Sequence, residues 1–569
     1  MSPQQRGRVN GPSPGGPAAY LQTQLGSACP VPRVQDAACG DVHEILQLLP
    51  VSFAALHELV PPLALLVSGA LLRPHPERAT ARHRATQLDR SIQVGLQLTS
   101  CGRVQSQCLQ QEIARVQHAH GPCKLLRQAH SPNEANTGVS TAAHSTAARG
   151  EAPRPMPREK AFDSTLGMMR DPYRFIRKRC VAFGEDVFQM RFMLRKTVCM
   201  SGPAAAQLFY DGERFIRRGA APLRLQYTLF GRGGVQSLDD ELHHNRKRAF
   251  MAMMTPERIR ELGDLSVECW RSAARTWGER RRIELYREAR EVLTRAVCAW
   301  TGVPLPEAEV SLRTHQLSAL FESAGAIGPR HWSGRVARNR AQAWAASLIE
   351  RVRRGELKVP QTCALHIIAT HREFTGDLLD THTAAVELIN VLRPTVAVAV
   401  FVTFEALALH DFPDCRERLV NDARGAYTEW FVQEVRRFYP FFPSVVARVR
   451  RDFVWKGYRF EAGTRTLLDL YGTDHDERVW EAPDEFYPER FRDWREDPYT
   501  FIPQGGGTHA MGHRCPGEWI TIELMARAAR FLTNEVRYDV PPQDLRIRFR
   551  RLPALPASGF VMENLRLDD

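Results

Sequence analysis

The sequence predicts an α+β protein that is mostly helical, and three observations lead to this prediction. Long segments with the apolar periodicity of helices recur between residues 255 and 533. Short strand-like pieces lie between the later helices, as in DFVWKGYRFEAGTRTLLDLY (452–471). Residues 1–155 differ in composition from the remainder, so the folded domain is expected to span residues 156–569.

The first 155 residues are rich in Pro, Gly, Ala, Ser, Gln and His and show little sustained periodicity. Residues 130–158 have the composition of a linker, so we expect residues 1–155 to form a low-complexity, disordered extension. The start, MSPQQRGRVNGPSPGG, lacks the apolar core of a secretory signal. The apolar stretch 45–72 is interrupted by polar residues and prolines, so no integral membrane segment is expected. We therefore expect a cytoplasmic location.

Periodicity defines the elements of the domain in order. Residues 171–202 predict a helix followed by a pair of strands. Further helices are predicted over 255–277, 283–301, 307–324, 334–354, 380–410, 425–439 and 517–533. A helical domain of this length can enclose a large cofactor.

Charge and cysteine content exclude several classes of protein. The net charge is +13, but the excess arginines are scattered, and neither a zinc-finger spacing nor a helix-turn-helix pattern is present. Nucleic-acid binding is therefore not expected. The twelve cysteines include no CxxC pair and are irregularly spaced, which argues against a zinc ribbon, a thioredoxin-type site or a disulfide framework.

The most informative segment is PQGGGTHAMGHRCPGEW (503–519), which precedes the last predicted helix. Its glycines allow tight backbone turns beside a flat group. Cys515 stands just before the helix, where free backbone N–H groups and the helix dipole favour a thiolate. A thiolate facing a glycine-lined loop suits axial ligation of a haem iron. The alternative is an inert buried cysteine.

Two further motifs favour the haem interpretation. WFVQEVRRFYPFFP places Glu434 and Arg437 one helical turn apart, where the side chains can pair. Arg490 follows in PDEFYPERF (483–491). This order of ExxR, PERF and glycine-rich cysteine loop resembles the cytochrome P450 superfamily. The resemblance implies the P450 fold, with a long central distal helix, a proximal Cys-ligand loop and small β-sheets. It also implies haem b (iron protoporphyrin IX), with Cys515 as axial ligand and Glu434, Arg437 and Arg490 as a buried structural triad.

The cysteine loop departs from the family pattern at two points. The family usually has Phe-Gly in the loop and an arginine two residues before the cysteine. Here His513 occupies the arginine position and Arg514 follows it. Either side chain could meet a haem propionate.

The long distal helix carries a second departure. An ordinary member of the superfamily has an acid–alcohol pair above the iron, whereas DTHTAAVELINVLRPTVAVAVFVTFEALALH (380–410) has Arg393 and Pro394 there. Proline removes a helix hydrogen bond and bends the axis. An arginine among apolar neighbours is costly unless an anion pairs with it, and a carboxylate is the natural partner.

INVLRPTVA, FVQEVRR, PQGGG and GHRCPGE together resemble the bacterial fatty-acid peroxygenase branch over residues 161–569. The resemblance implies hydroxylation of long-chain fatty acids at the α or β carbon with hydrogen peroxide and without a redox partner. The substrate carboxylate is then held by Arg393 and serves as the acid–base group. It also implies that Gln236 lies above the haem, Phe230 lines the pocket, Phe441 and Phe442 form the acyl channel, and His243, Arg217 and Lys247 contact the haem edge or a propionate.

Three alternatives remain open at this point. Decarboxylation to a terminal alkene would use the same site, although Gln236 favours hydroxylation because a histidine accompanies strong decarboxylation in the family. A monooxygenase fed by a redox partner would need the missing acid–alcohol pair. A non-catalytic haem sensor or carrier would have no need of a buried cation over the iron.

Overall fold

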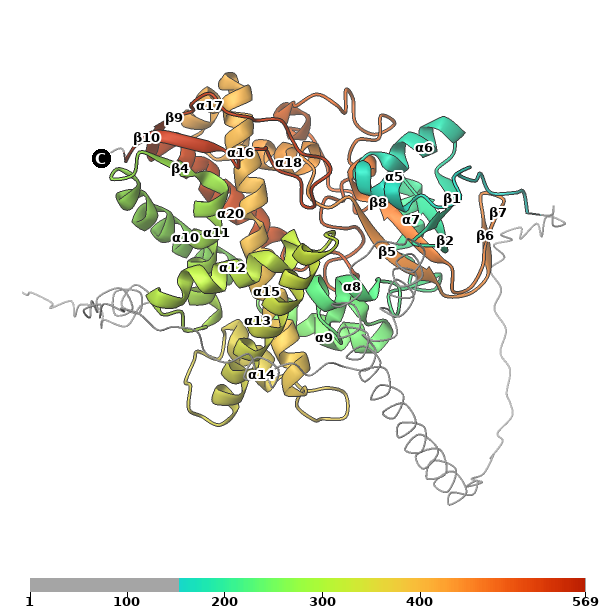
Figure 1. Ribbon diagram of the computed structural model, residues 1–569, viewed down its shortest axis with the longest axis horizontal. Coiled ribbons are helices and arrows are strands. Elements are labelled where there is room, and N and C mark those ends of the chain that lie inside the picture. The colour runs from blue at the N-terminus through green and yellow to red at the C-terminus, as the bar shows by residue number, and fades with distance from the viewer. Residues whose placement is uncertain (1–152, 568–569) are drawn as a thin grey trace, which may run out of the picture. The chain divides into compact units, whose positions relative to one another are not determined.

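The computed structural model describes residues 153–567 (Figure 1). Apart from residues 153–155, the predicted N-terminal extension lies outside the described residues. The described part of the chain contains every residue that the sequence nominates for the site.

The long predicted helices are present, with bounds within a few residues of those expected. They are α10 (Pro256–Trp277), α11 (Leu285–Thr301), α12 (Val310–Glu322), α13 (Pro329–Arg353), α15 (Thr381–Ala397), α16 (Ala399–Asp411), α18 (Ala426–Phe438) and α20 (Glu518–Asn534). Local chemistry sets their starts. The Thr255 side chain accepts a hydrogen bond from the backbone N–H of Arg258 at the start of α10, and Pro256 takes the first helical position.

Further helices complete the helical part, and the sequence periodicity did not resolve most of them. The 13-residue helix Asp240–Ala252 buries several polar side chains in place of one apolar face, and the others have nine residues or fewer, too few for a clear apolar stripe. They are α5 (Thr165–Arg170), α6 (Phe175–Phe183), α7 (Pro203–Phe209), α8 (Leu223–Leu225), α9 (Asp240–Ala252), α14 (Ala364–Thr370), α17 (Pro413–Val420) and α19 (Leu470–Thr473). A five-residue π-helix, Gln226–Phe230, follows α8 directly.

The strands form small sheets, as predicted. The largest has the order β1-β2-β8-β5-β3, formed by β1 (Val187–Phe192), β2 (Arg195–Met200), β8 (Arg465–Asp469), β5 (Ser444–Val449) and β3 (Phe215–Ile216). Only the β2–β8 pairing in it is parallel. The other sheets join β4 (Arg282–Glu284), β10 (Val561–Leu567) and β9 (Val536–Asp539), and β6 (Phe453–Trp455) with β7 (Tyr458–Phe460).

The predicted helix 380–410 is α15 followed directly by α16, which run end to end in Figure 1. The Asp380 side chain caps α15 by accepting a hydrogen bond from the N–H of Thr383 (2.9 Å). Pro394 lies inside α15, which ends three residues later at Ala397. The pair is long and apolar enough to cross a membrane, but 94% of its apolar window is buried inside the protein. It is therefore the central core helix of this fold.

The main hydrophobic core surrounds α15 and α16. It takes side chains from α10, α11, α13, α18 and α20, and α20 packs against α10, α16 and α18 (Figure 1). A second cluster lies on the five-stranded sheet. This packing fixes α20, and with it the loop that precedes it, against the central helix.

Candidate functional site

The cysteine loop ends two residues before the N-cap of α20, as the sequence predicted. The backbone N–H of Cys515 donates to the carbonyl of Gln504 (3.2 Å), and this hydrogen bond joins the end of the loop to its start. Gly505 and Gly507 have φ angles of 95° and 81°, which a residue with a Cβ rarely adopts. The loop therefore needs glycine at these positions to hold the sulfur in place.

The pKa of the Cys515 thiol differs from the sequence prediction, which expected the helix N-terminus to favour a thiolate. Burial raises the pKa of the thiol, Glu518 raises it further, and these effects outweigh the hydrogen bond from the backbone of Gly517. The helix terminus alone thus does not produce a thiolate. Coordination to a metal deprotonates a thiol outright, so ligation to a haem iron would produce the thiolate that the protein environment alone does not favour.

Gln504 is a contact of the sulfur that the sequence reasoning missed. Its Nε2 lies 3.8 Å from Cys515 Sγ and donates to Thr521 Oγ1 (3.0 Å). Its Oε1 accepts a hydrogen bond from Arg436 (3.2 Å), which orients the amide so that its N–H groups face the sulfur. The signal was available, because Gln504 is the one polar side chain in the PQGGG segment of the cysteine loop.

The predicted structural triad is assembled in the interior. Arg437 donates two hydrogen bonds to Glu434 (2.7 and 2.8 Å), and both side chains are fully buried. Arg490 Nε lies 3.1 Å from Glu434 Oε2. The remaining donors of Arg437 bind the backbone carbonyls of Asp474, Pro483 and Glu485. The cluster thus joins α18 to the segment that leads into the cysteine loop.

Four basic or titratable side chains gather next to the cysteine loop. The rings of His243 and His513 lie 3.9 Å apart, and burial lowers the pKa of both imidazoles, that of His243 to about 3. Arg217 is buried, and burial lowers its pKa to about 10. The Lys247 ammonium donates to the carbonyls of Gly512 (2.9 Å) and Arg514 (2.5 Å). Lys247 therefore fastens the loop, which is a structural use of the residue.

The two candidates for the family's arginine position behave differently. Arg514 is committed to carboxylates, with Nε 2.7 Å from Glu518 and a second contact of 2.8 Å to Glu496. His513 faces Arg217 and His243 and lies 4.0 Å from Asp239. Arg514 is thus already paired with carboxylates of the protein. His513 is the better candidate for a propionate contact. The propionate contacts of Arg217, His243 and His513 stay predictions.

Arg393 is buried on α15 and lacks a carboxylate partner among the described residues. Its Nη2 donates to Asn390 Oδ1 (3.3 Å), and its Nε has no hydrogen-bond partner. Burial, and then the positive charge of Arg338, lower the pKa of Arg393 to about 9, which still leaves it charged at neutral pH. The Cys515 sulfur, when ionised, is near enough to act in the opposite sense and raise the pKa of Arg393.

The nearby carboxylate of Glu387 is already used. It accepts hydrogen bonds from Arg246 (2.7 Å), the backbone N–H of Val235 (2.8 Å) and Asn390 (2.9 Å). Asn390 also donates to Gln236 Oε1 (3.2 Å), so that Gln236 is linked to Arg393 through one amide. Asn390 is another residue that sequence reasoning missed.

A second buried arginine adds to the positive charge. Arg338 on α13 donates to the carbonyl of Leu229 (3.3 Å), while its Nη2 is unpartnered. Gly231 makes room for it, because a Cβ at Gly231 would lie 2.1 Å from that nitrogen. The site therefore holds two buried guanidinium groups in excess of the carboxylates that pair with them.

The predicted channel phenylalanines are only partly interior. Phe441 is buried and packs on Phe401 with ring centroids 4.4 Å apart. Phe230 is half-buried at the end of the π-helix and packs against the main core. Phe442 is 37% exposed, so it cannot be a wholly interior wall.

The residues present fit a haem. Among residues 153–567, no three His, Cys, Asp or Glu side chains are placed to hold a metal ion together. Cys515 would then be the single protein ligand, which suits an iron already held by porphyrin nitrogens. Arg217 would meet the two propionate carboxylates as a cation, and the neutral imidazoles of His243 and His513 would donate N–H groups to them.

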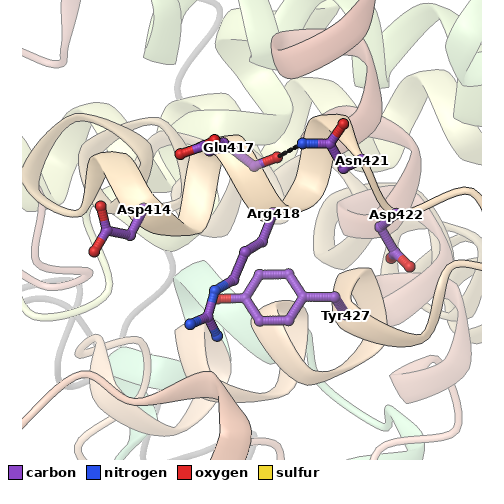
Figure 2. A pocket seen from close by; sticks show the side chains of 6 residues that line it. All are labelled: Asp414, Glu417, Arg418, Asn421, Asp422 and Tyr427. Atoms are coloured by element: carbon purple, nitrogen blue, oxygen red, sulfur yellow. Dashed lines mark hydrogen bonds between the residues drawn. The ribbon is translucent and has the colours of Figure 1, made fainter.

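A surface hollow of about 600 Å³ has a lining that shares no residue with this site, and its side chains are drawn in Figure 2. Arg418 lies over the ring of Tyr427 (5.6 Å), and Asn421 donates to the backbone carbonyl of Glu417 (2.9 Å). The hollow contains no residue nominated by the sequence, and Arg418 and Asp422 are paired with residues outside its lining, Glu489 and Thr428. Its lining is Asp414, Glu417, Arg418, Asn421, Asp422 and Tyr427.

Comparison with known proteins gives a consistent answer. The family model described as cytochrome P450 matches residues 424–533, which contain the triad helix and the cysteine loop. A structure of a variant of cytochrome P450SP alpha (CYP152B1) is 53% identical, with a TM-score of 0.70, and the match covers 72% of this chain and 100% of that one. Taxane 10-beta-hydroxylase from Taxus cuspidata is a more distant relative, 24% identical over 69% of this chain and 84% of its own length.

Two similar structures contain fatty acids. Cytochrome P450EX alpha (CYP152N1), solved with myristic acid, is 45% identical, with a TM-score of 0.70 over 73% of this chain and 100% of that one. A variant of cytochrome P450 OleT in complex with arachidonic acid is 31% identical, with a TM-score of 0.71 over 73% and 99%. This chain therefore belongs to the cytochrome P450 family, and within it to the bacterial fatty-acid peroxygenase branch.

Proposed function

We propose that the protein hydroxylates long-chain fatty acids at the α or β carbon with hydrogen peroxide, and that its cofactor is haem b. The observation that carries the proposal is Arg393, a buried guanidinium without a carboxylate partner among residues 153–567. A buried, unpaired cation costs several kcal/mol in a folded protein, so its retention calls for an anion that arrives later. The fatty acids bound to two similar structures are anions of the required kind.

Each residue of the site has a definable part in this reaction. Arg393 would hold the substrate carboxylate in bidentate fashion, with Asn390 fixing the guanidinium and Gln236 fixing Asn390. The carboxylate so placed can accept a proton from one peroxide oxygen and return it to the other, which replaces the missing acid–alcohol pair. When bound, the haem supplies the iron at which the peroxide is activated. Pro394 and the early end of α15 would leave room beside it.

The fixed carboxylate also sets the position of oxidation. A carboxylate anchored on Arg393 brings its own α and β carbons nearest to the reacting centre and leaves the alkyl tail to the apolar side chains beyond. Phe441, which is buried against Phe401, and Phe230 are the proposed lining of that tail channel. Holding a substrate in register converts binding energy into selectivity and rate.

Decarboxylation to a terminal alkene is the second candidate, because it would use the same anchored carboxylate and the same site. Gln236 favours hydroxylation, because its amide is engaged with Asn390 and does not titrate. A reaction fed by a redox partner is disfavoured, since α15 carries Arg393 and Pro394 where an acid–alcohol pair would relay protons.

We also propose that the protein is located in the cytoplasm.

One incubation tests the proposal. Purified, haem-loaded protein is mixed with myristic acid and hydrogen peroxide, without reductase, and the products are identified by mass spectrometry. We expect 2- and 3-hydroxymyristic acid, with a smaller amount of alkene. Omission of peroxide is the control. Product that forms only with a reductase, NADPH and dioxygen would refute peroxide dependence, and the absence of any fatty-acid product would refute the proposed substrate.

A further inference from the structure

A surface pocket of about 780 Å³ lies away from the Cys515 loop and is lined mainly by arginines. It is formed by the end of α5, the start of α6, the first turn of α13 and the segment 547–551. That segment belongs to RIRFRR (546–551), in which arginines alternate with apolar side chains. The lining is Arg170, Asp171, Arg174, Arg330, Ile547, Arg548, Phe549, Arg550 and Arg551.

The charge in this pocket is not balanced. Asp171 is its only carboxylate, and it already accepts from Arg174 (3.0 Å) and Lys178 (2.6 Å). Arg551 contacts Glu322 (3.4 Å). Within residues 153–567, the arginines of the pocket that form no ion pair are Arg170, Arg330, Arg548 and Arg550.

Its floor is apolar. Phe549 is half-buried and packs against Tyr173 with ring centroids 6.0 Å apart, while the guanidinium of Arg174 lies 4.4 Å above the Phe549 ring. Four unpaired cations beside apolar side chains suit an amphiphile, whose charged head pairs with guanidinium groups while its chain contacts Ile547 and the apolar stems of the arginines.

The pocket adjoins the proposed acyl channel. The buried hydroxyl of Tyr173 donates to the carbonyl of Phe441 (3.0 Å) and accepts from the N–H of Ala554 (2.9 Å). The floor of the pocket is thus separated by one tyrosine from the backbone of a residue that we assign to the channel wall.

We propose that this arginine pocket is an outer binding site for the carboxylate end of a fatty acid, distinct from the inner site at Arg393. The identity of the acid rests on the proposed function, whereas the binding of an anionic amphiphile does not. The phosphate of an anionic lipid offers the same chemistry, so the test includes it as a separate arm. Surface arginines that concentrate an anion near a channel speed its entry at low ionic strength.

The test uses Arg548→Gln/Arg550→Gln, which removes two exposed and unpaired charges from the pocket. Arg340→Gln/Arg424→Gln is the matched control, because it removes two exposed arginines elsewhere at the same change in net charge. Binding of radiolabelled dodecanoate to the haem-loaded, full-length proteins is measured by equilibrium dialysis at low ionic strength. In parallel, the change in the haem absorption spectrum reports the inner site alone.

We expect wild-type protein and control to bind a second, spectrally silent equivalent of dodecanoate. The pocket variant should bind that equivalent about tenfold more weakly, since each exposed pair contributes modestly. Added salt should weaken the binding of this second equivalent, and uncharged dodecanol should not compete with dodecanoate for the site. If the variant retains the silent equivalent as the control does, or if dodecanol displaces it equally well, the proposal is wrong.

The second arm measures flotation with phosphatidylglycerol and phosphatidylcholine vesicles. If the pocket variant loses affinity only for phosphatidylglycerol vesicles, the site binds anionic amphiphiles but its ligand is a lipid head group, and the assignment to a free fatty acid is overturned. Failure of the outer-site proposal can be distinguished from failure of the proposed function. Peroxide-driven turnover and the spectral change report the inner site, and each can fail while the silent equivalent remains.

Discussion

Replacement of Arg393 by alanine is the most direct test of the substrate site. The guanidinium is buried, interacts with Asn390 through one long hydrogen bond and has an unpartnered Nε. Its removal therefore breaks no ion pair of the protein among the described residues. The free protein should fold as well as the wild type or better, while the bound carboxylate loses its partner.

The size of the effect follows from the burial of the site. Loss of one member of a buried ion pair costs about 3–5 kcal/mol, because the other charge stays desolvated. At ~1.4 kcal/mol per tenfold change, peroxide-driven oxidation of fatty acids should fall by roughly two to three orders of magnitude. Arg393→Lys should recover only part of the activity, since a point charge does not reproduce the bidentate geometry.

The assay is kcat/KM for myristic acid with peroxide, together with haem content and the spectrum of the reduced carbon monoxide complex. Arg340→Ala, at an exposed position, is the control for loss of an arginine. A second measurement supplies acetate and styrene in place of the fatty acid. Acetate should provide the carboxylate in wild-type protein, so styrene is oxidised there but not by Arg393→Ala. If Arg393→Ala keeps full activity on fatty acids, the carboxylate is held elsewhere and the reasoning fails.

Three other predictions concern the support of the site. Gln504→Leu removes an N–H donor from the Cys515 sulfur, so the reduction potential of the haem iron should fall by roughly 40 mV, equivalent to about 1 kcal/mol; an unchanged potential in a spectroelectrochemical titration would contradict this. Glu434→Gln leaves Arg437 buried without its carboxylate and should cost about 3–5 kcal/mol, seen as low soluble yield and a lower Tm; wild-type stability would show that the cluster is dispensable. Deletion of residues 1–152 should preserve haem binding and activity, because all the site residues lie in 153–567; haem-free product would count against it.

The sequence predicted the helices well for a physical reason. Segments such as 255–277 and 425–439 bury one face, and the resulting apolar stripe repeats with the helical period. The short helices α7 and α14 bury too few residues for such a stripe to show. The sheet order was beyond reach, because β2 pairs in parallel with β8, more than 260 residues later in the chain, and nothing local specifies that partner.

The site residues also differ in whether the local sequence reveals their role. Cys515, Glu434 and Arg393 stand in motifs whose local pattern carries the chemistry. Asn390 and Arg338 do not, because their roles come from contacts made across the fold, such as the 154-residue separation between Asn390 and Gln236. The pKa of Cys515 shows the same limit, since the local helix terminus predicts a thiolate while the burial imposed by distant elements opposes it.

The placement of charge in the interior of this protein suits an anionic ligand. Arg393 and Arg338 are buried close enough to lower the pKa of Arg393, a repulsion that destabilises the free protein. The neighbouring carboxylate of Glu387 could have relieved it, but Arg246 and the N–H of Val235 hold that group away. A positive site kept open in this way binds an anion more strongly than one already neutralised. Because a ligand that binds only the folded state stabilises it, a long-chain fatty acid should raise the Tm of the haem-loaded protein, whereas the corresponding alcohol should do so far less.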